Sequence, residues 1–157
     1  MKVPEMTLCH IFNDFTGATP SILLKKASRG VSKGKWNAVG GKIERGETPE
    51  EGAFREAFEE SGLAVSRLFY HGKMLFHLDG ANFLVHLFST HTYAGKLTES
   101  DEGELAWFKL SEIPYDKMWD DDQFWLTLML RSVKFDAKVY FNENGIVDEM
   151  TIYRRFD

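Results

Sequence analysis

Residues 41–63 read GKIERGETPEEGAFREAFEESGL, and this stretch carries the signals of one helix together with both of its ends. Thr48 suits the N-cap, Pro49 the first helical position and Glu51 the third, where it completes a capping box. Gly62 follows the last residue of the helical pattern and is typical of a helix end. The sequence therefore predicts a helix between Thr48 and Gly62, preceded by a glycine-containing loop.

Three acidic residues of this predicted helix share one face. At about 100° per residue, Glu56, Glu59 and Glu60 stand at positions i, i+3 and i+4. The apolar residues around the opposite side, where we expect burial, are Phe54, Ala57 and Phe58. Carboxylate oxygens are the ligands that Mg²⁺ prefers, so the cluster indicates a metal-assisted phosphate site. The alternative is an acidic face in contact with water.

The composition outside this stretch is that of a soluble globular protein. The 157 residues, 43% hydrophobic and 27% charged, are enough for one domain over residues 1–157 with a core of its own. No stretch approaches the roughly 20 apolar residues needed to span a bilayer, and the N-terminus does not resemble a secretory signal, so we expect a cytoplasmic protein and no membrane partner. A net charge of −5 argues against nucleic acid as a partner.

The remaining pattern predicts an α+β fold. Strands are expected at residues 6–12, 21–24, 65–78, 83–92 and 104–110, and a second helix at residues 120–133. Asp79-Gly80 and Asn144-Gly145 are typical of hairpin turns, and the second of these joins a final pair of strands. A mixed β-sheet sandwiched between α-helices is the natural arrangement of these elements.

The stretch quoted above also matches the pattern G-x5-E-x7-R-E-U-x-E-E-x-G-U, in which U is aliphatic. The matching residues are Gly41, Glu47, Arg55, Glu56, Glu59, Glu60, Gly62 and Leu63. Only Ala57, at an aliphatic position, is a weak match. In these residues the chain resembles the Nudix hydrolases, which are related to MutT and which cleave nucleoside diphosphate derivatives.

The resemblance implies a Nudix fold and a set of catalytic roles. Mg²⁺, or Mn²⁺ in its place, would be bound by the carbonyl of Gly40 and by the three helical glutamates. Arg55 would pair with Glu47 and orient those ligands. The general base would be Glu59, Glu60 or an acid outside the motif. Glu102, in ESDEGELAWF, is the best outside candidate for base and for metal ligand, and the alternative for it is a surface-loop acid.

A narrower resemblance covers most of the chain. The segments KWNAVGGKIERGE, ESDEGELAWFKLSEIPYDKMWDDDQFW and KFDAKVYF are similar to the mammalian MutT-homologue branch of oxidised-purine nucleoside triphosphatases. This narrower resemblance implies a site for the purine base of the nucleotide, made by Asn37, Trp119, Asp121 and Asp122. An indole can stack on a purine, and adjacent carboxylates with shifted pKa values can present a donor and an acceptor. Taken alone, the acids could cap the helix and Trp119 could pack in the core.

The same site has further candidate residues. Additional candidate substrate-binding residues are Thr7, Lys42 and Phe83. Two departures from that branch are Asp120, which stands in place of proline, and Val31, which stands in place of an aromatic residue. A basic position is also displaced, and Lys25, Lys26 and Arg29 could each replace it.

These observations predict a Mg²⁺-dependent enzyme that hydrolyses oxidised purine nucleoside triphosphates, such as 8-oxo-dGTP, to the monophosphate and pyrophosphate, and so clears the nucleotide pool. The alternatives are a Nudix pyrophosphatase for ADP-ribose, a nucleotide sugar or a dinucleoside polyphosphate, and a non-catalytic nucleotide-binding module. The expected partner is a small-molecule nucleotide, and the expected state is a monomer or a homodimer.

Overall fold

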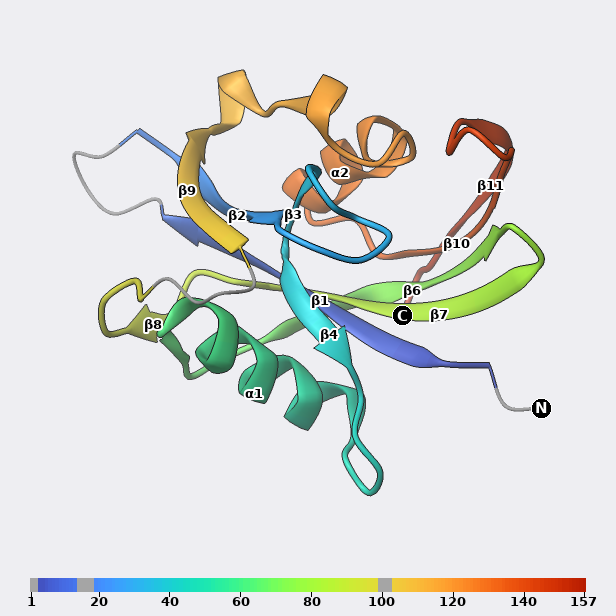
Figure 1. The fold of residues 1–157 in the computed structure, drawn as a ribbon. Helices are drawn as coiled ribbons and strands as arrows, with labels where there is room; N and C mark the ends of the chain where they lie inside the picture. The colour runs from blue at the N-terminus through green and yellow to red at the C-terminus, as the bar shows by residue number, and fades with distance from the viewer. Residues whose placement is uncertain (1–2, 14–18, 99–102) are drawn as a thin grey trace.

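A computed structural model describes residues 3–13, 19–98 and 103–157 of the chain, and Figure 1 shows its ribbon. The two helices are α1 (Pro49–Ser61) and α2 (Asp122–Leu130), and short 3-10 turns lie at Leu110–Glu112 (η1) and Tyr115–Lys117 (η2). The strands are β1 (Glu5–Asn13), β2 (Ser21–Ala27), β3 (Trp36–Asn37), β4 (Val39–Lys42), β5 (Ala64–Val65), β6 (Phe69–Leu78), β7 (Ala81–Thr90), β8 (Tyr93–Ala94), β9 (Gly103–Lys109), β10 (Phe135–Phe141) and β11 (Val147–Arg154).

The main sheet is mixed, as predicted. Its strand order is β11-β10-β6-β7-β1-β2-β3, with β4 paired to β1 and β9 paired to β2. The β1/β7 and β10/β6 pairs are parallel and the other pairs are antiparallel. Along one edge, β1 pairs with β4 over Met6–Cys9 and with β2 over Ile11–Asn13. This division of one edge brings β4 beside α1.

The helices lie on opposite faces of the sheet, α1 below and α2 above it in Figure 1. Successive side chains of β1 therefore enter two different cores. Leu8 and Phe12 pack in the cluster that contains the apolar side chains of α2, whereas Cys9 and Ile11 pack with Ala57 of α1. The predicted arrangement of a sheet between helices is confirmed.

Helix α1 has the ends that its sequence predicts. The Thr48 side chain accepts from the Glu51 amide at 3.1 Å, and the Glu51 carboxylate accepts from the Thr48 amide at 3.0 Å. Gly62 adopts φ +79° and donates its amide to Phe58, which closes the helix. The expectation that Phe58 is buried is wrong, because its side chain is 56% exposed. The helix packs on the sheet through small residues such as Ala53 and Ala57 instead.

Two predicted elements have different limits. Residues 65–78 do not form one strand, because β5 pairs with β8 and the intervening Arg67 carbonyl accepts from the Thr90 hydroxyl. The second helix is shorter than residues 120–133. It ends before Ser132, whose φ of +58° cannot continue a right-handed helix. Within the described residues, no helix is both long and apolar enough to cross a membrane.

Candidate active site

The acidic face of α1 meets the glycine pair of β4. A methyl group added at Gly41 would lie 2.7 Å from the Glu56 carboxylate, a separation that real side chains do not show. The Gly40 amide donates to Glu60 Oε1 at 2.6 Å. Glycine at position 41 therefore leaves room for the Glu56 carboxylate, whereas glycine at position 40 is required by the backbone of β1, where a methyl group would collide with the Thr7 carbonyl oxygen.

Arg55 ties the motif together through its planar guanidinium. It binds Glu47 with two hydrogen bonds, from Nε at 2.6 Å and from Nη2 at 2.9 Å. Its Nη2 also donates to the Lys42 carbonyl at 3.0 Å, and its Nη1 donates to Glu56 at 2.9 Å and to Glu59 at 3.1 Å. These bonds raise the pKa of Arg55 and lower that of Glu47. The predicted pairing of Arg55 with Glu47 has the geometry of a fork on a carboxylate.

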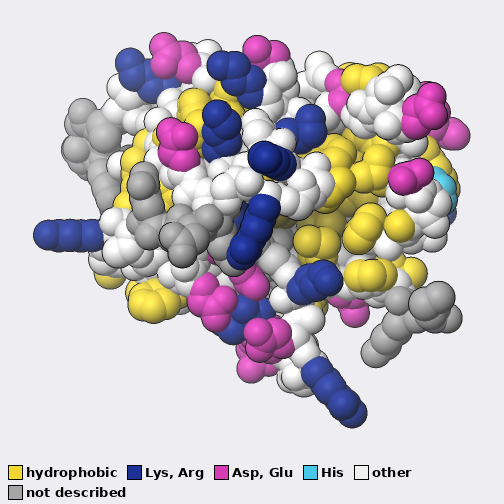
Figure 2. All heavy atoms as spheres, viewed as in Figure 1, with side chains coloured by type: hydrophobic (Ala, Val, Ile, Leu, Met, Phe, Trp, Pro, Cys, Tyr) yellow, Lys and Arg dark blue, Asp and Glu magenta, His cyan; other side chains and the backbone are white. Residues whose placement is uncertain are grey.

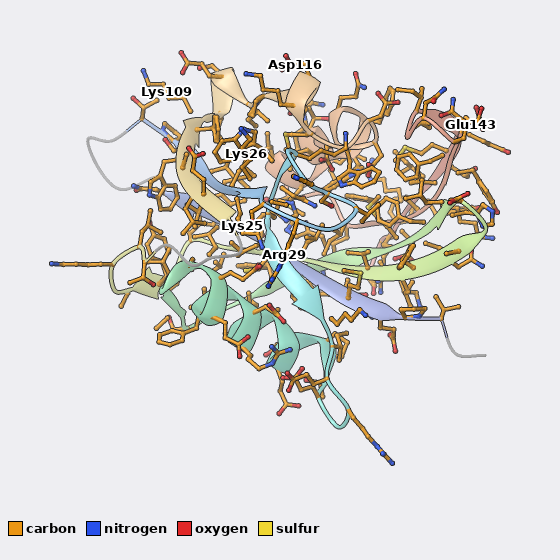
Figure 3. All side chains as sticks on the ribbon, viewed as in Figure 1. Lys25, Lys26, Arg29, Lys109, Asp116 and Glu143 are labelled. Carbon is orange, nitrogen blue, oxygen red and sulfur yellow. The ribbon has the colours of Figure 1, made fainter. Side chains whose placement is uncertain are left out.

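Glu60 is the most buried acid of the motif. Only 4% of its side chain is exposed, and Lys25 of β2, labelled in Figure 3, forms an ion pair with it. Burial raises the pKa of Glu60, while hydrogen bonds from Lys25 and from the Gly40 amide oppose that shift. Sequence reasoning named Lys25 only as one of three basic candidates. The signal available in the sequence was a lysine that directly follows three apolar residues, which are buried in β2.

The donor set of the α1 acids fits a divalent cation. Among residues 3–13, 19–98 and 103–157, no three His, Cys, Asp or Glu side chains converge closely enough to hold a metal as they lie. Lys25 and Arg55 bind the carboxylates instead. Glu56 and Glu60 nevertheless offer hard oxygen ligands, with side chains only 15% and 4% exposed, and buried carboxylates require positive charge.

A second group of acids stands at the start of α2. Asp121 and Asp122 are 1% and 4% exposed. Asp121 Oδ2 accepts from the Trp125 indole at 2.7 Å, but Asp121 Oδ1 and Asp122 Oδ2 have no hydrogen-bond partner among the residues that the structure describes. Burial raises the pKa of Asp121 to about 6, and burial with the neighbouring Asp121 raises that of Asp122 well above its ordinary value.

The alternative reading of these acids as helix caps is not supported. Asp121 is the N-cap residue of α2, yet its side chain makes no capping hydrogen bond. Asp120, the residue that replaces proline, accepts from Gln123 and from the Val147 amide at 2.9 Å each. It therefore links the start of α2 to β11, whereas Asp121 accepts from the Trp125 indole.

Trp119 is held by the loop at residues 28–35. Its indole donates to the Ser32 hydroxyl at 3.0 Å, and Lys35 Nζ lies 5.2 Å from the ring centroid. On the other side it makes an edge contact with Phe141, with the ring centroids 5.5 Å apart. Sequence reasoning did not identify Ser32, because a lone loop serine carries no signal of its partner.

The other predicted substrate residues are divided between the two faces. Phe83 lies on the same face of β7 as Val85 and Leu87, which pack with α2. Asn37 uses its Oδ1 to accept from the next amide at 2.8 Å, and Lys42 is exposed at the end of β4. Thr7 shares its side of β1 with Cys9 and Ile11 and faces α1. Its assignment to the substrate site stays a prediction. Glu102 lies outside the described residues.

The space-filling view shows the charges on this side of the molecule. Acidic side chains gather over α1, and basic side chains lie above them across the centre (Figure 2). Figure 3, from the same viewpoint, places Lys25 and Arg29 in that central region. Apolar side chains gather beside it, between the loop at residues 28–35 and strands β6 and β7. Positive charge thus lies between the α1 acids and an apolar surface.

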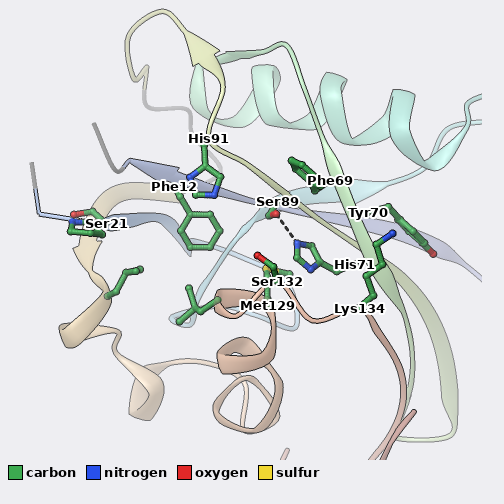
Figure 4. A pocket seen from close by; sticks show the side chains of 13 residues that line it. Phe12, Ser21, Phe69, Tyr70, His71, Ser89, His91, Met129, Ser132 and Lys134 are labelled. Atoms are coloured by element: carbon green, nitrogen blue, oxygen red, sulfur yellow. Dashed lines mark hydrogen bonds between the residues drawn. The ribbon is translucent and has the colours of Figure 1, made fainter. Parts of the chain in front are cut away.

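A separate cavity of about 460 Å³ lies near the far end of β1 (Figure 4). Phe12, Phe69 and Met129 contribute to its wall, as do His71 and Ser89, which are hydrogen bonded at 2.6 Å. Within the described part of the chain, none of the predicted site residues lines it. This cavity is therefore distinct from the candidate active site.

Comparisons with known proteins agree with this arrangement. The model of the NUDIX domain matches residues 3–128. The chain is 41% identical over 128 residues to the oxidized purine nucleoside triphosphate hydrolase of Mus musculus, covering 80% of this chain and 82% of the relative. The protein of the same name from Danio rerio is 41% identical over 130 residues, covering 82% and 83%.

Among solved structures, the MutT protein of Bacillus halodurans superposes with a TM-score of 0.82 over 96% of this chain and 97% of its own. At 22% identity, that likeness concerns the fold alone. The family match and the two relatives go further, because each covers most of the chain. This chain belongs to the Nudix hydrolase family.

Proposed function

We propose that this protein hydrolyses oxidised purine nucleoside triphosphates, such as 8-oxo-dGTP, to the monophosphate and pyrophosphate, and that it clears such nucleotides from the cytoplasmic pool. The observation that carries the proposal is the buried pair Asp121 and Asp122, each with an oxygen that no group in the described part of the chain satisfies. Buried polar atoms without partners are costly and rare, so a ligand is the natural source of the missing bonds.

The pKa values of the pair suit the edge of a purine. Burial and the neighbouring Asp121 raise the pKa of Asp122 well above its ordinary value, which favours a carboxyl that can donate, whereas Asp121, whose pKa is raised to about 6, can accept. Trp119 offers an aromatic face beside them. The names of the two relatives at 41% identity support the same substrate class.

The α1 side of the site supplies the hydrolytic chemistry. Nudix hydrolases generally use a divalent metal, and we assign Glu56, Glu59, Glu60 and the Gly40 carbonyl to hold Mg²⁺, or Mn²⁺ in its place. When bound, the metal neutralises phosphate oxygens and polarises the anhydride. Arg55 is held by Glu47 and orients the carboxylates of Glu56 and Glu59 through hydrogen bonds.

One acid of this group must also take the proton of the attacking water. Glu59, with 56% of its side chain exposed, is the one that water reaches most readily, and we assign it as the general base. Glu102 is the alternative base. Water attacks one of the two phosphorus atoms of the α–β anhydride and its proton passes to the carboxylate, while the bridging oxygen leaves on the phosphate group that is not attacked.

A substrate panel tests the proposal. We would measure kcat/KM with Mg²⁺ for 8-oxo-dGTP, 2-oxo-dATP, dGTP, dATP and ADP-ribose and identify the products. We expect at least about a tenfold preference for an oxidised triphosphate, with pyrophosphate released, since about 1.4 kcal/mol of differential contact suffices. Trp119→Ala should reduce that preference. ADP-ribose as the best substrate would overturn the purine assignment and leave the family membership intact.

A further inference from the structure

Both oxygens of the Glu60 carboxylate are bound by groups of the chain itself. Oε1 accepts from the Gly40 amide at 2.6 Å, and Oε2 is in an ion pair with the ammonium group of Lys25. The Glu60 side chain is 4% exposed and that of Lys25 is 14% exposed, so the pair is shielded from water. Arg55 binds Glu47, Glu56 and Glu59, whereas the cation at Glu60 is supplied by a different element, β2.

A divalent metal and an ammonium group compete for such a carboxylate. At contact distance two cations repel strongly in a shielded environment, and a bound metal needs the oxygen that Lys25 now occupies. The backbone of Lys25 is fixed between β3 and β9, where it pairs with Asn37 and Leu105. Its four-carbon stem can nevertheless swing the ammonium aside while the strand stays in place.

We propose that Lys25 is an exchangeable counter-ion of Glu60, which holds this carboxylate in place in the metal-free protein and is displaced when the divalent metal binds. The proposal rests on the assignment of Glu60 as a metal ligand made above. Metal binding is then an exchange of cations, in which Lys25 stabilises the metal-free fold and weakens the apparent metal affinity.

The neighbouring lysine provides a matched control. Lys26 follows directly on the same strand, so its side chain points to the opposite face, and it is exposed. Lys25→Met and Lys26→Met remove the same charge and add the same thioether. Lys25→Arg keeps a cation at the position of interest.

The experiment measures Mn²⁺ affinity at pH 8 by electron paramagnetic resonance, and Tm in EDTA. For Lys25→Met we expect Mn²⁺ to bind on the order of tenfold more tightly, because loss of the competing cation is worth about 1.4 kcal/mol or more. Its Tm in EDTA should fall by several degrees, because a buried carboxylate loses its partner. Lys26→Met and Lys25→Arg should stay near the wild type in both measurements.

An Mn²⁺ affinity of Lys25→Met within twofold of that of Lys26→Met would overturn the proposal. If Lys25→Met does not fold in EDTA, the dependence of its Tm on Mn²⁺ concentration yields the affinity. The double variant Lys25→Met/Glu60→Gln should then recover Tm in EDTA. A double variant whose loss of Tm equals the sum of the two single losses would also count against the proposal.

Glu60→Gln separates this inference from the proposed function. If that variant binds Mn²⁺ as tightly as the wild type, Glu60 is not a ligand, and both the metal assignment and the role of Lys25 fail. If Glu60→Gln binds Mn²⁺ weakly while Lys25→Met is unchanged, only the role of Lys25 fails.

Discussion

Replacing Asp121 with asparagine should stabilise the protein in a manner that depends on pH. Folding raises the pKa of Asp121 from 3.8 to about 6, chiefly through burial. Between these two values the folded protein holds a proton that the unfolded chain has released, so stability falls as pH rises through this window. A shift of about two units corresponds to about 3 kcal/mol at 1.36 kcal/mol per unit. The side chain is 1% exposed, so solvent screens little of this cost.

Asparagine removes the charge and leaves the local contact intact. Its carbonyl can still accept from the Trp125 indole, as Asp121 Oδ2 does at 2.7 Å. At pH 8 we therefore expect Asp121→Asn to be more stable than the wild type by up to about 3 kcal/mol, or about 6 to 12 °C in Tm for a chain of this size. The difference should shrink between about pH 6 and pH 4 and be absent below that range.

Urea unfolding of both proteins at pH 3.5, 5, 6, 7 and 8 measures this difference directly. Any change in packing contributes equally at every pH, so only the titration produces a slope. Asp116→Asn, at an exposed position shortly before α2, controls for loss of a carboxylate. A difference between Asp121→Asn and wild type that stays constant from pH 3.5 to 8 would refute the argument that burial of this acid carries a cost.

Three further substitutions probe the α1 side of the site. Gly41→Ala places a methyl group 2.7 Å from the Glu56 carboxylate, so we expect kcat to fall at least about tenfold with little change in Tm. Full activity would show that catalysis does not require the Glu56 carboxylate beside residue 41. Arg55→Lys loses the fork on Glu47, and Mn²⁺ affinity should weaken by about 10- to 100-fold, which titration of the metal would detect. Thr48→Ala removes the side-chain cap of α1 and should cost about 1 kcal/mol in urea unfolding; an unchanged midpoint would mean that the cap contributes nothing.

Local chemistry explains which features of α1 were predictable. The capping box, the proline at the first position and the terminating Gly62 all act within a few residues, so the sequence alone predicted both ends of the helix. The pairing of Arg55 with Glu47 spans eight residues and followed from the motif. In the same way, the hairpin turns at Asp79-Gly80 and Asn144-Gly145 follow from residues that favour positive φ.

Contacts between distant segments were not predictable in this way. The helix that Thr7 faces was not predictable, because strand alternation defines two sets of residues but not which helix covers each set. The break at β5 depends on pairing with β8, almost 30 residues later, and not on the residues that interrupt the strand. The burial of Phe58 was also misjudged, since helical periodicity does not show how closely a helix approaches its sheet.

The amino-acid sequence by itself determined the family motif, the capped helix, the acids that it aligns and the pair at the start of α2, because each depends on spacing along the chain. Only the tertiary structure decided what those acids meet. Lys25 reaches Glu60 across 35 residues and Ser32 reaches Trp119 across 87. The packing of the sheet between its helices also leaves Asp121 and Asp122 buried, each with one oxygen unpaired within residues 3–13, 19–98 and 103–157. Partners and burial of this kind follow from where the strands place each side chain in space, which no local pattern specifies.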